Sequence, residues 1–280
     1  MTDPISSGSG AVGDALRRGA GVVRHPVRAL RTIAGQGPLY PLLILFALNA
    51  VDELDRSAFY VLIPEIRDEF ELGFQGLLTF VGAVNVLVLA LAVPIAGLAD
   101  RYSRVRIALA GALAWSVFSF STGLATGILF LGFVRSGSAI GASVVPPTHN
   151  PLLSDWFPPA DRPRVFAFHR SANVIGASLG FVLAGQLGYH FGWRTPFLIL
   201  AIPTLVVVLA ALRLRDPVRG AHERRAAGAE AEAVDIEEPP PSYAEAWRMC
   251  WKIATLRRIF AALPFLAAGL TALWLLNVLY

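Results

Sequence analysis

The residues best suited to chemistry lie inside an apolar stretch, residues 39–64 of this 280-residue chain. The second half of that stretch carries one amide and four ionisable side chains: Asn49, Asp52, Glu53, Asp55 and Arg56. An ionised side chain at the centre of a membrane-spanning helix costs at least about 2.5 kcal/mol. We therefore expect these groups to face other helices or water rather than lipid. Charges inside a membrane usually mark the path of a solute or ion.

Arg135 is the expected partner of Asp55. At 100° per residue, Asn49, Asp52, Glu53 and Arg56 share one broad helical face, which Asp55 borders. Asp52 and Arg56 have the i,i+4 spacing of an ion pair. A helix over 128–157 would run opposite to the helix over 39–64, which places Arg135 and Asp55 at similar depths and lets them face each other across a cavity.

A carboxylate beside a guanidinium is hard to protonate, and it becomes easier to protonate when the arginine turns to an anionic substrate. Competition for Arg135 can therefore couple proton and solute movement. The alternative is a permanent buried ion pair that only fixes helix packing. His149 lies on nearly the same helical stripe as Arg135 and is either a second titratable group or a hydrogen-bonded packing residue. Arg170 and Asn173 are weaker candidates for the cavity wall.

The composition indicates a membrane protein with no enzyme active site. Apolar residues make up 55% of the chain and charged residues 16%, and the mean hydropathy is +0.57. The arginines behind the net charge of +4 lie between apolar runs, which favours membrane topology over nucleic-acid binding. The single cysteine, Cys250, excludes an intramolecular disulfide and a cysteine-based metal site. We see no phosphate-binding loop, Ser-His-Asp set or metal cluster, and we expect no cofactor.

Six apolar runs of helical length follow one another at hairpin spacing, approximately 39–64, 74–99, 105–124, 128–157, 165–191 and 195–214. We therefore predict an all-α membrane protein with five regions. These are a basic N-terminal arm (1–38), a six-span bundle (39–214), a disordered linker rich in Ala, Glu, Arg and Pro (215–242), an amphipathic interfacial helix (243–258) and a seventh transmembrane helix (259–280).

The orientation follows from the arginines. They are concentrated in the N-terminal arm, in the second and fourth connections and after the sixth span. By the positive-inside rule the N-terminus is cytoplasmic. We expect a multi-pass protein of the cytoplasmic membrane whose partners are membrane lipids and a small-molecule or lipid-like substrate.

The connection after the second span, residues 97–106, reads Gly-Leu-Ala-Asp-Arg-Tyr-Ser-Arg-Val-Arg. It resembles the signature loop of the major facilitator superfamily, although Ala96 and Ser103 stand where the family has glycine. The resemblance implies the N-terminal six-helix bundle of that fold, a 3+3 inverted repeat, followed by a second six-helix half. It also implies an inner gate of charged residues, Asp100, Arg101, Arg104 and Arg106. Asp155, at the inner end of the fourth span, is the expected partner of Arg104 or Arg106. The alternative is plain topogenic charge with weak surface pairs.

A narrower resemblance covers about residues 49–197. Asp55-Arg56 in the first span and Arg135-Ser136-Gly137 in the fourth are similar to Spinster-type lipid transporters and to organic anion:cation symporters. The position that usually carries a coupling glutamate in these groups is Ala142. Any coupling must then use another group or none, and among the possible groups Asp55 is the first candidate and Asp52 the second.

These observations predict a secondary transporter that moves an organic anion or an amphipathic, lipid-like solute by alternating access, with protons as the candidate coupling ion. Asp55, Arg56 and Arg135 would form the substrate and coupling site, supported by Asn49, Asp52 and Glu53. The alternative is a non-transporting membrane module, an anchor, sensor or accessory subunit, of a larger fusion or a fragment. A second six-helix half elsewhere in the full-length protein would favour transport.

Overall fold

The computed structural model describes residues 26–234, 236 and 241–279, and every regular element among them is a helix. This confirms the all-α prediction. The chain divides into two compact units, Met1–Glu237 and Glu238–Tyr280. Residues 1–25 of the predicted N-terminal arm lie outside the described residues.

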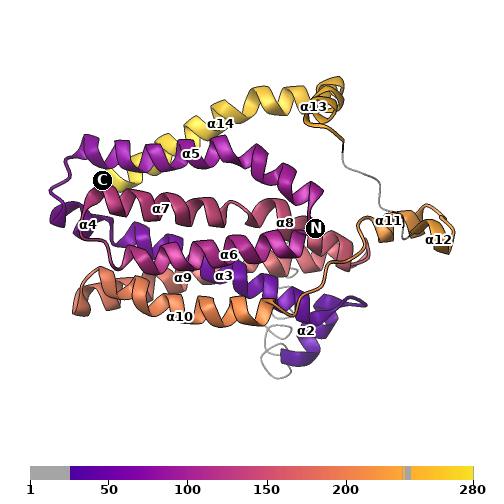
Figure 1. The fold of residues 1–280 in the computed structure, drawn as a ribbon, viewed down its shortest axis with the longest axis horizontal. Coiled ribbons are helices and arrows are strands. Elements are labelled where there is room, and N and C mark those ends of the chain that lie inside the picture. Colours follow the sequence, from indigo (N-terminus) through magenta and orange to yellow (C-terminus); the bar gives the residue numbers. More distant parts are fainter. Residues whose placement is uncertain (1–25, 235, 237–240, 280) are drawn as a thin grey trace, which may run out of the picture. The chain divides into compact units, whose positions relative to one another are not determined.

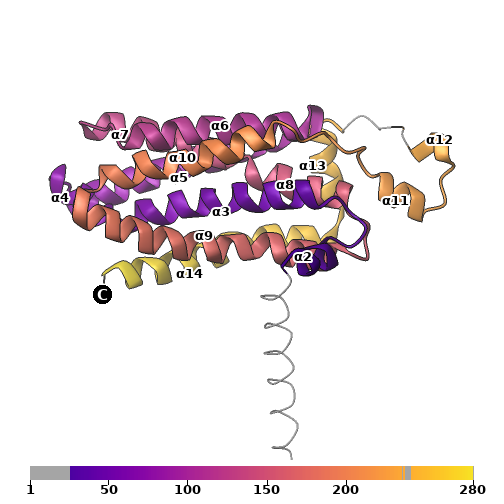
Figure 2. The same ribbon diagram turned by 90° about the horizontal axis from the view of Figure 1, so that it is seen from below.

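The first unit is a bundle of long helices that run roughly alongside one another (Figures 1 and 2). Its elements in chain order are α2 (Pro26–Ala34), α3 (Leu39–Val61), α4 (Ile63–Glu69), α5 (Phe74–Arg101), α6 (Arg104–Thr122), α7 (Ile128–Ala142), α8 (Val145–Trp156), α9 (Arg162–Phe191), α10 (Arg194–Ala211), α11 (Ala221–Ala226) and α12 (Ala231–Val234).

Five stretches of the described residues are long and apolar enough to cross a membrane: Thr79–Arg101, Arg104–Thr122, Ile128–Trp156, Arg162–Phe191 and Arg194–Ala211. The helix α3 does not qualify alone, because every 18-residue window within it includes the charged cluster from Asp52 to Arg56. Taken with α2, from which it is bent by 99°, it makes a sixth candidate. The chain is therefore a multi-pass membrane protein.

The predicted fourth span consists of two helices. The helix α7 ends at Ala142 and α8 begins at Val145, followed at once by Pro146 and Pro147. Proline lacks the amide hydrogen that an internal helical position requires and clashes with the preceding turn. The backbone is therefore interrupted beside Ala142.

The helix α3 packs closely against α9. A Cβ atom added to Gly176 would collide with the carbonyl oxygen of Ala50, and one added to Gly180 would lie 2.5 Å from that of Leu54. Small residues let helices approach in this way inside membranes. The polar face of α3 is held at a fixed position as a result.

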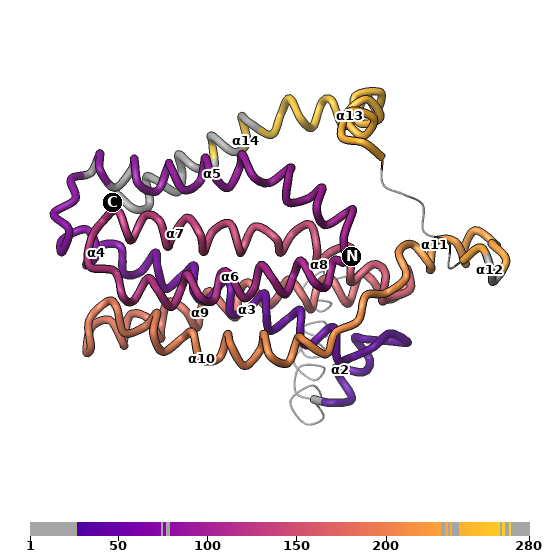
Figure 3. Tube along the Cα trace, in the orientation of Figure 1, coloured from indigo at the N-terminus to yellow at the C-terminus, as the bar shows by residue number. Residues whose placement is uncertain are grey.

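The segment predicted as a disordered linker is folded in part. Residues 215–234, which we call the strap, follow α10 and include α11 and α12 (Figure 3). Ala221 and Val234 are buried in it. The strap lies at the end of the bundle that carries the α5–α6 and α8–α9 connections, which we call the basic end. The composition of the strap does not predict this order, because the strap is held mainly by polar contacts with the bundle rather than by buried apolar residues.

The second unit contains α13 (Tyr243–Lys252) and α14 (Ala254–Leu279). Ser242 and Glu245 form a capping box that starts α13, and Trp247 stacks on Trp251. The predicted interfacial helix over 243–258 is thus shorter than expected. The chain extends at Ile253, with φ −86° and ψ 110°, so the last helix begins at 254 rather than 259.

Candidate functional site

A cavity of about 730 Å³ lies in the first unit, between α3, α5, α6, α7, α8 and α9. The polar residues predicted on the first span and Arg135 all line it, as do Arg170 and Asn173. The wall from α5 is largely apolar, with Phe80, Val84 and Val88. The structure therefore brings a charged wall and an apolar wall to one cavity.

Asp55 and Arg135 form a buried ion pair in this wall. Arg135 Nη1 donates to Asp55 Oδ2 at 3.2 Å. Arg135 is 9% exposed and Asp55 is 5% exposed. The Arg135 guanidinium also lies over the Phe59 ring, 4.2 Å from its centroid. The ring face stabilises the cation through its quadrupole. The pairing predicted from matching depths is present.

Two residues of α6 complete the surroundings of Asp55, and sequence reasoning missed both. Trp115 Nε1 donates to Asp55 Oδ2 at 3.3 Å, and Ser119 Oγ donates to Oδ1. Both side chains are buried. Their i,i+4 spacing puts a tryptophan and a hydroxyl on one face of an apolar helix, which is the only signal the sequence offers.

Arg56 is held differently from Arg135. Its Nη2 lies 3.3 Å from Asp52 Oδ2 and its Nη1 lies 3.9 Å from Glu53 Oε2. The Arg56 side chain is 50% exposed, whereas that of Asp52 is 5% exposed. The i,i+4 pair predicted on the first span is present, and its cation reaches into the cavity.

Asn49 and His149 face other side chains of the bundle. Asn49 Nδ2 donates to Asn173 Oδ1 at 2.7 Å and to the His169 carbonyl oxygen at 3.1 Å. His149 is buried, and its Nδ1 lies 3.2 Å from His169 Nε2. It is not among the residues that line the large cavity. The structure therefore places His149 in a histidine pair between α8 and α9.

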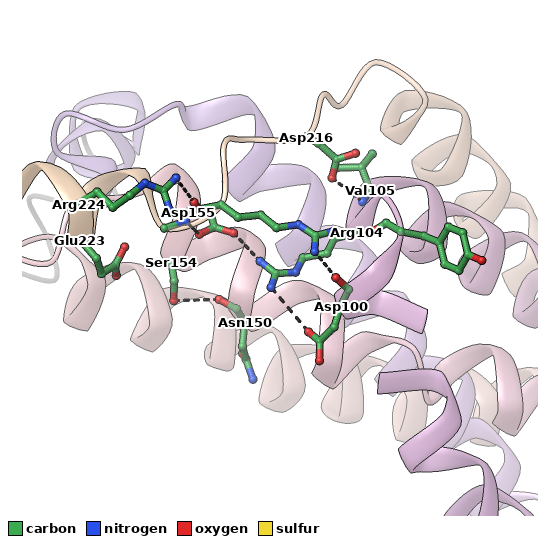
Figure 4. Close-up of polar contacts among 12 residues, drawn as sticks. Asp100, Arg104, Val105, Asn150, Ser154, Asp155, Asp216, Glu223 and Arg224 are labelled. Atoms are coloured by element: carbon green, nitrogen blue, oxygen red, sulfur yellow. Dashed lines mark hydrogen bonds and ion pairs between the residues drawn. The ribbon is translucent and has the colours of Figure 1, made fainter. Parts of the chain in front are cut away.

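At the basic end, Asp155 joins three segments (Figure 4). Arg104 Nη1 lies 2.5 Å from Asp155 Oδ2, and Arg104 Nη2 lies 3.8 Å from Asp100 Oδ1. The backbone amide of Gly220, in the strap, donates to Asp155 Oδ1 at 2.9 Å. Of the other predicted gate residues, Arg101 donates to the Gly97 carbonyl oxygen at 3.4 Å, and Arg106 is exposed.

The strap makes further polar contacts with the bundle. Asp216 Oδ1 accepts from the Val105 amide at 3.0 Å, and its Oδ2 accepts from Ser103 Oγ. The Arg219 guanidinium donates to the carbonyl oxygens of Asp100 and Tyr102. Glu223 pairs with Arg162 at 2.6 Å, and its hydrogen bond with that arginine lowers the pKa of the Glu223 carboxyl group.

The opposite end of the bundle, formed by α4 and the α6–α7 and α9–α10 connections, has a smaller polar cluster. Glu69 Oε1 lies 2.5 Å from Arg194 Nη2, and Trp193 Nε1 donates to Glu69 Oε2 at 2.6 Å. Arg194 also donates to the carbonyl oxygen of Ala125 at 2.7 Å. The hydrogen bond with Arg194 lowers the pKa of Glu69. Among the described residues, no three His, Cys, Asp or Glu side chains could hold a metal ion.

Residues 45–280 match the family model of the Major Facilitator Superfamily. This chain belongs to that superfamily. It is 26% identical over 167 residues to the hexuronate transporter of Bacillus subtilis and 28% identical over 197 residues to protein spinster of Drosophila melanogaster. A crystal structure of a bacterial homologue of the human lysosomal transporter Spinster, inward-facing and occupied, matches 68% of the chain at 26% identity, with a TM-score of 0.59.

Membership confirms the predicted family and the fold class. The relatives come from both branches that the sequence resembles, the Spinster-like and the organic-anion transporters. The matched segments cover 59% and 68% of this chain but only 39% and 31% of those two relatives.

Proposed function

We propose that the protein containing this chain is a secondary active transporter that moves an organic anion or an amphipathic, lipid-like solute by alternating access. The observation that carries the proposal is the buried Asp55–Arg135 pair in the wall of the large cavity. An inert membrane anchor has no use for charges that oppose its insertion.

The cavity has the chemistry that such a solute requires. Arg135 is shared between a carboxylate and the Phe59 ring, and Arg56 is half exposed to the same space. An anionic group on the substrate would bind these guanidinium groups, while the α5 wall would contact an apolar portion. Arg135 would then leave Asp55, which becomes easier to protonate.

Protons are the proposed coupling ion. Ala142 lines the cavity, so the glutamate common in the resembling families is replaced by a methyl group there. Asp55 is the first candidate for the titrating group, and Asp52, also in the cavity wall, is the second. His149 is the weakest, because it packs against His169.

The cluster at the basic end is the proposed inner gate. Arg104 and Asp155 connect α6 to α8, and Gly220 adds the strap to the same carboxylate. We propose that this end is cytoplasmic, as the positive-inside rule predicts, and that the protein lies in the cytoplasmic membrane. A second six-helix half in the full-length protein would complete the cavity, in line with the greater length of the relatives.

A non-transporting membrane module remains the second candidate function, and uptake into proteoliposomes separates the two. The full-length protein is tested with radiolabelled glucuronate as a sugar-acid probe and a fluorescent single-chain phospholipid as a lipid-like probe. Loss of a buried ion-pair partner costs about 3 kcal/mol. We therefore expect Asp55→Asn and Arg135→Ala each to reduce uptake at least about tenfold.

Arg67→Ala is the matched control. Within the described part of the chain Arg67 forms an ion pair only with its exposed neighbour Asp68, so the substitution should leave uptake unchanged. Full uptake by both Asp55→Asn and Arg135→Ala would contradict the proposed site. Absence of uptake for both probes by the wild-type protein would favour the non-transporting module.

A further inference from the structure

We propose that Ser119 and Trp115 are positioning residues that decide where the coupling proton binds on Asp55. Ser119 directs the proton to Oδ1, and Trp115 keeps Oδ2 as the acceptor for Arg135. This inference rests on the proposed function and adds to it a specific proton-binding atom and two residues of α6.

The geometry separates the two oxygens of Asp55. Among the described residues, Oδ2 accepts from two donors, Arg135 Nη1 and Trp115 Nε1, while Oδ1 accepts from Ser119 Oγ. Asp55, Trp115 and Ser119 are all buried, at 5%, 3% and 6% exposure. The carboxylate therefore depends on these partners rather than on bulk water.

The position of Trp115 is fixed by the contact between α6 and α7. A Cβ atom added to Gly141 would lie 2.6 Å from the Trp115 backbone nitrogen and 2.7 Å from the Gly111 carbonyl oxygen. The two helices therefore touch through their backbones beside the indole. Trp115 and Ser119 are separated by one helical turn, so the same contact holds both on the side of Asp55.

The two α6 groups differ in hydrogen-bonding chemistry. An indole N–H and a guanidinium can only donate, whereas a serine hydroxyl can donate or accept. A proton on Oδ2 would face the Trp115 N–H even after Arg135 has left, and it would find no acceptor among the contacts of the described residues. A proton on Oδ1 forms an O–H group that donates to Ser119 Oγ once the hydroxyl has rotated. The protonated form of Asp55 is therefore accommodated on the Ser119 side only.

The charged groups around Asp55 come from three helices. Asp52, Glu53 and Arg56 lie on α3 itself, Arg135 comes from α7 and Arg170 from α9, and all line the same cavity. The residues that α5 and α6 contribute to the lining are uncharged. When substrate takes Arg135, Trp115 and Ser119 stay beside the carboxylate. They therefore remain in place to decide which oxygen receives the coupling proton.

The test is the pH profile of uptake by the full-length protein in proteoliposomes, with glucuronate and the single-chain phospholipid as probes. A hydrogen bond to a charged group is worth about 1.5 to 3 kcal/mol. The indole N–H of Trp115 bonds only the charged form of Asp55, so Trp115→Phe should move the midpoint of the profile to higher pH by about one unit or more. Ser119→Ala removes a partner of both the charged and the protonated form, so it should lower maximal uptake and move the midpoint less than Trp115→Phe. Ser119→Thr restores the hydroxyl and should return both values towards those of the wild type.

Ser116→Ala is the matched control, since Ser116 is also buried on α6 but is not a donor to Asp55 among the contacts that the structure shows. A fall in maximal uptake with an unmoved midpoint in both Ser119→Ala and Trp115→Phe would overturn the inference. Wild-type uptake without pH dependence would also overturn the inference, but it would not contradict the proposed transport function. Absence of wild-type uptake would instead contradict the proposed function. If Ser119→Ala does not fold, Trp115→Phe and Ser119→Thr still decide the question.

Discussion

The two ends of the bundle are closed by different chemistry. At the basic end, the Arg104 and Asp155 side chains are 15% and 8% exposed, and both oxygens of Asp155 are used. At the opposite end, the Arg194 and Glu69 side chains are 34% and 40% exposed. Solvent therefore screens the ion pair at the basic end weakly and the ion pair at the opposite end strongly.

The difference shows that equal ion-pair distances do not mean equal strength. Both closest contacts measure 2.5 Å, yet the carboxylate at the basic end is far less exposed than Glu69 and also binds the strap. Removing one partner from a buried pair leaves a charge without compensation, whereas an exposed charge is solvated by water. The basic end should therefore be the more sensitive of the two.

Asp155→Asn should have the largest effect. It leaves Arg104 with only the more distant carboxylate of Asp100, at a cost of about 3 kcal/mol. If the cluster is the inner gate, Asp155→Asn should open it. A cysteine introduced into the cavity by Ala96→Cys should then react with a thiol reagent added on the basic side at least about tenfold faster than it does when Asp155 is present. The background variant is Cys250→Ser, which removes the single cysteine. Unchanged reactivity would argue against a gating role.

Asp216→Ala should have an intermediate effect. It deprives the Val105 amide and the Ser103 hydroxyl of their acceptor, which costs about 1 kcal/mol near the start of α6. Thermal unfolding followed by tryptophan fluorescence should show a lower Tm, and Ala96→Cys reactivity should rise less than in Asp155→Asn. A strap without influence on the gate would leave that reactivity unchanged.

Glu69→Gln should lower the free energy of unfolding by less than about 1 kcal/mol, because the Glu69–Arg194 pair is exposed. The measurement is the Tm at neutral pH, compared with Arg67→Ala as a surface control on the same helix. A loss as large as that of Asp155→Asn would contradict the contrast between the two ends.

The pH dependence of that small loss has a definite sign. Arg194 lowers the pKa of Glu69 in the folded protein, so the pair contributes stability above the ordinary glutamate pKa of about 4.3. The contribution is lost as the pH falls through the lowered value. The Tm difference between wild type and Glu69→Gln should therefore be present at pH 7 and disappear below about pH 4. A difference that grows on acidification would be inconsistent with the ion pair.

The sequence predicts the contacts that depend on simple helical geometry. Asp52 and Arg56 follow from i,i+4 spacing, and Asp55 and Arg135 follow from their depths in antiparallel helices. The position of Asp155 at the inner end of the fourth span predicts a contact with Arg104 or Arg106, and the structure shows Arg104 as the partner. Each of these predictions needs only the order and direction of the helices.

The remaining contacts depend on details that periodicity does not contain. The stripe from Arg135 to His149 assumes one uninterrupted helix, but the helix is interrupted between Ala142 and Val145, and His149 lies against His169 instead of lining the large cavity. Trp115 resembles an ordinary core residue until α6 is packed beside Asp55. The order of the strap depends on polar contacts with distant loops, which its composition does not reveal.

The glycine contacts between α3 and α9 have a mechanical consequence. With Gly176 and Gly180 against the α3 backbone, these two helices can neither slide nor tilt apart without losing that fit, so they behave as one lever. The Asp55–Arg135 contact joins this lever to α7 in the wall of the cavity. A movement of α3 that opens that contact should therefore carry Arg170 and Asn173 of α9 along with the carboxylates of α3, while Arg135 stays with α7.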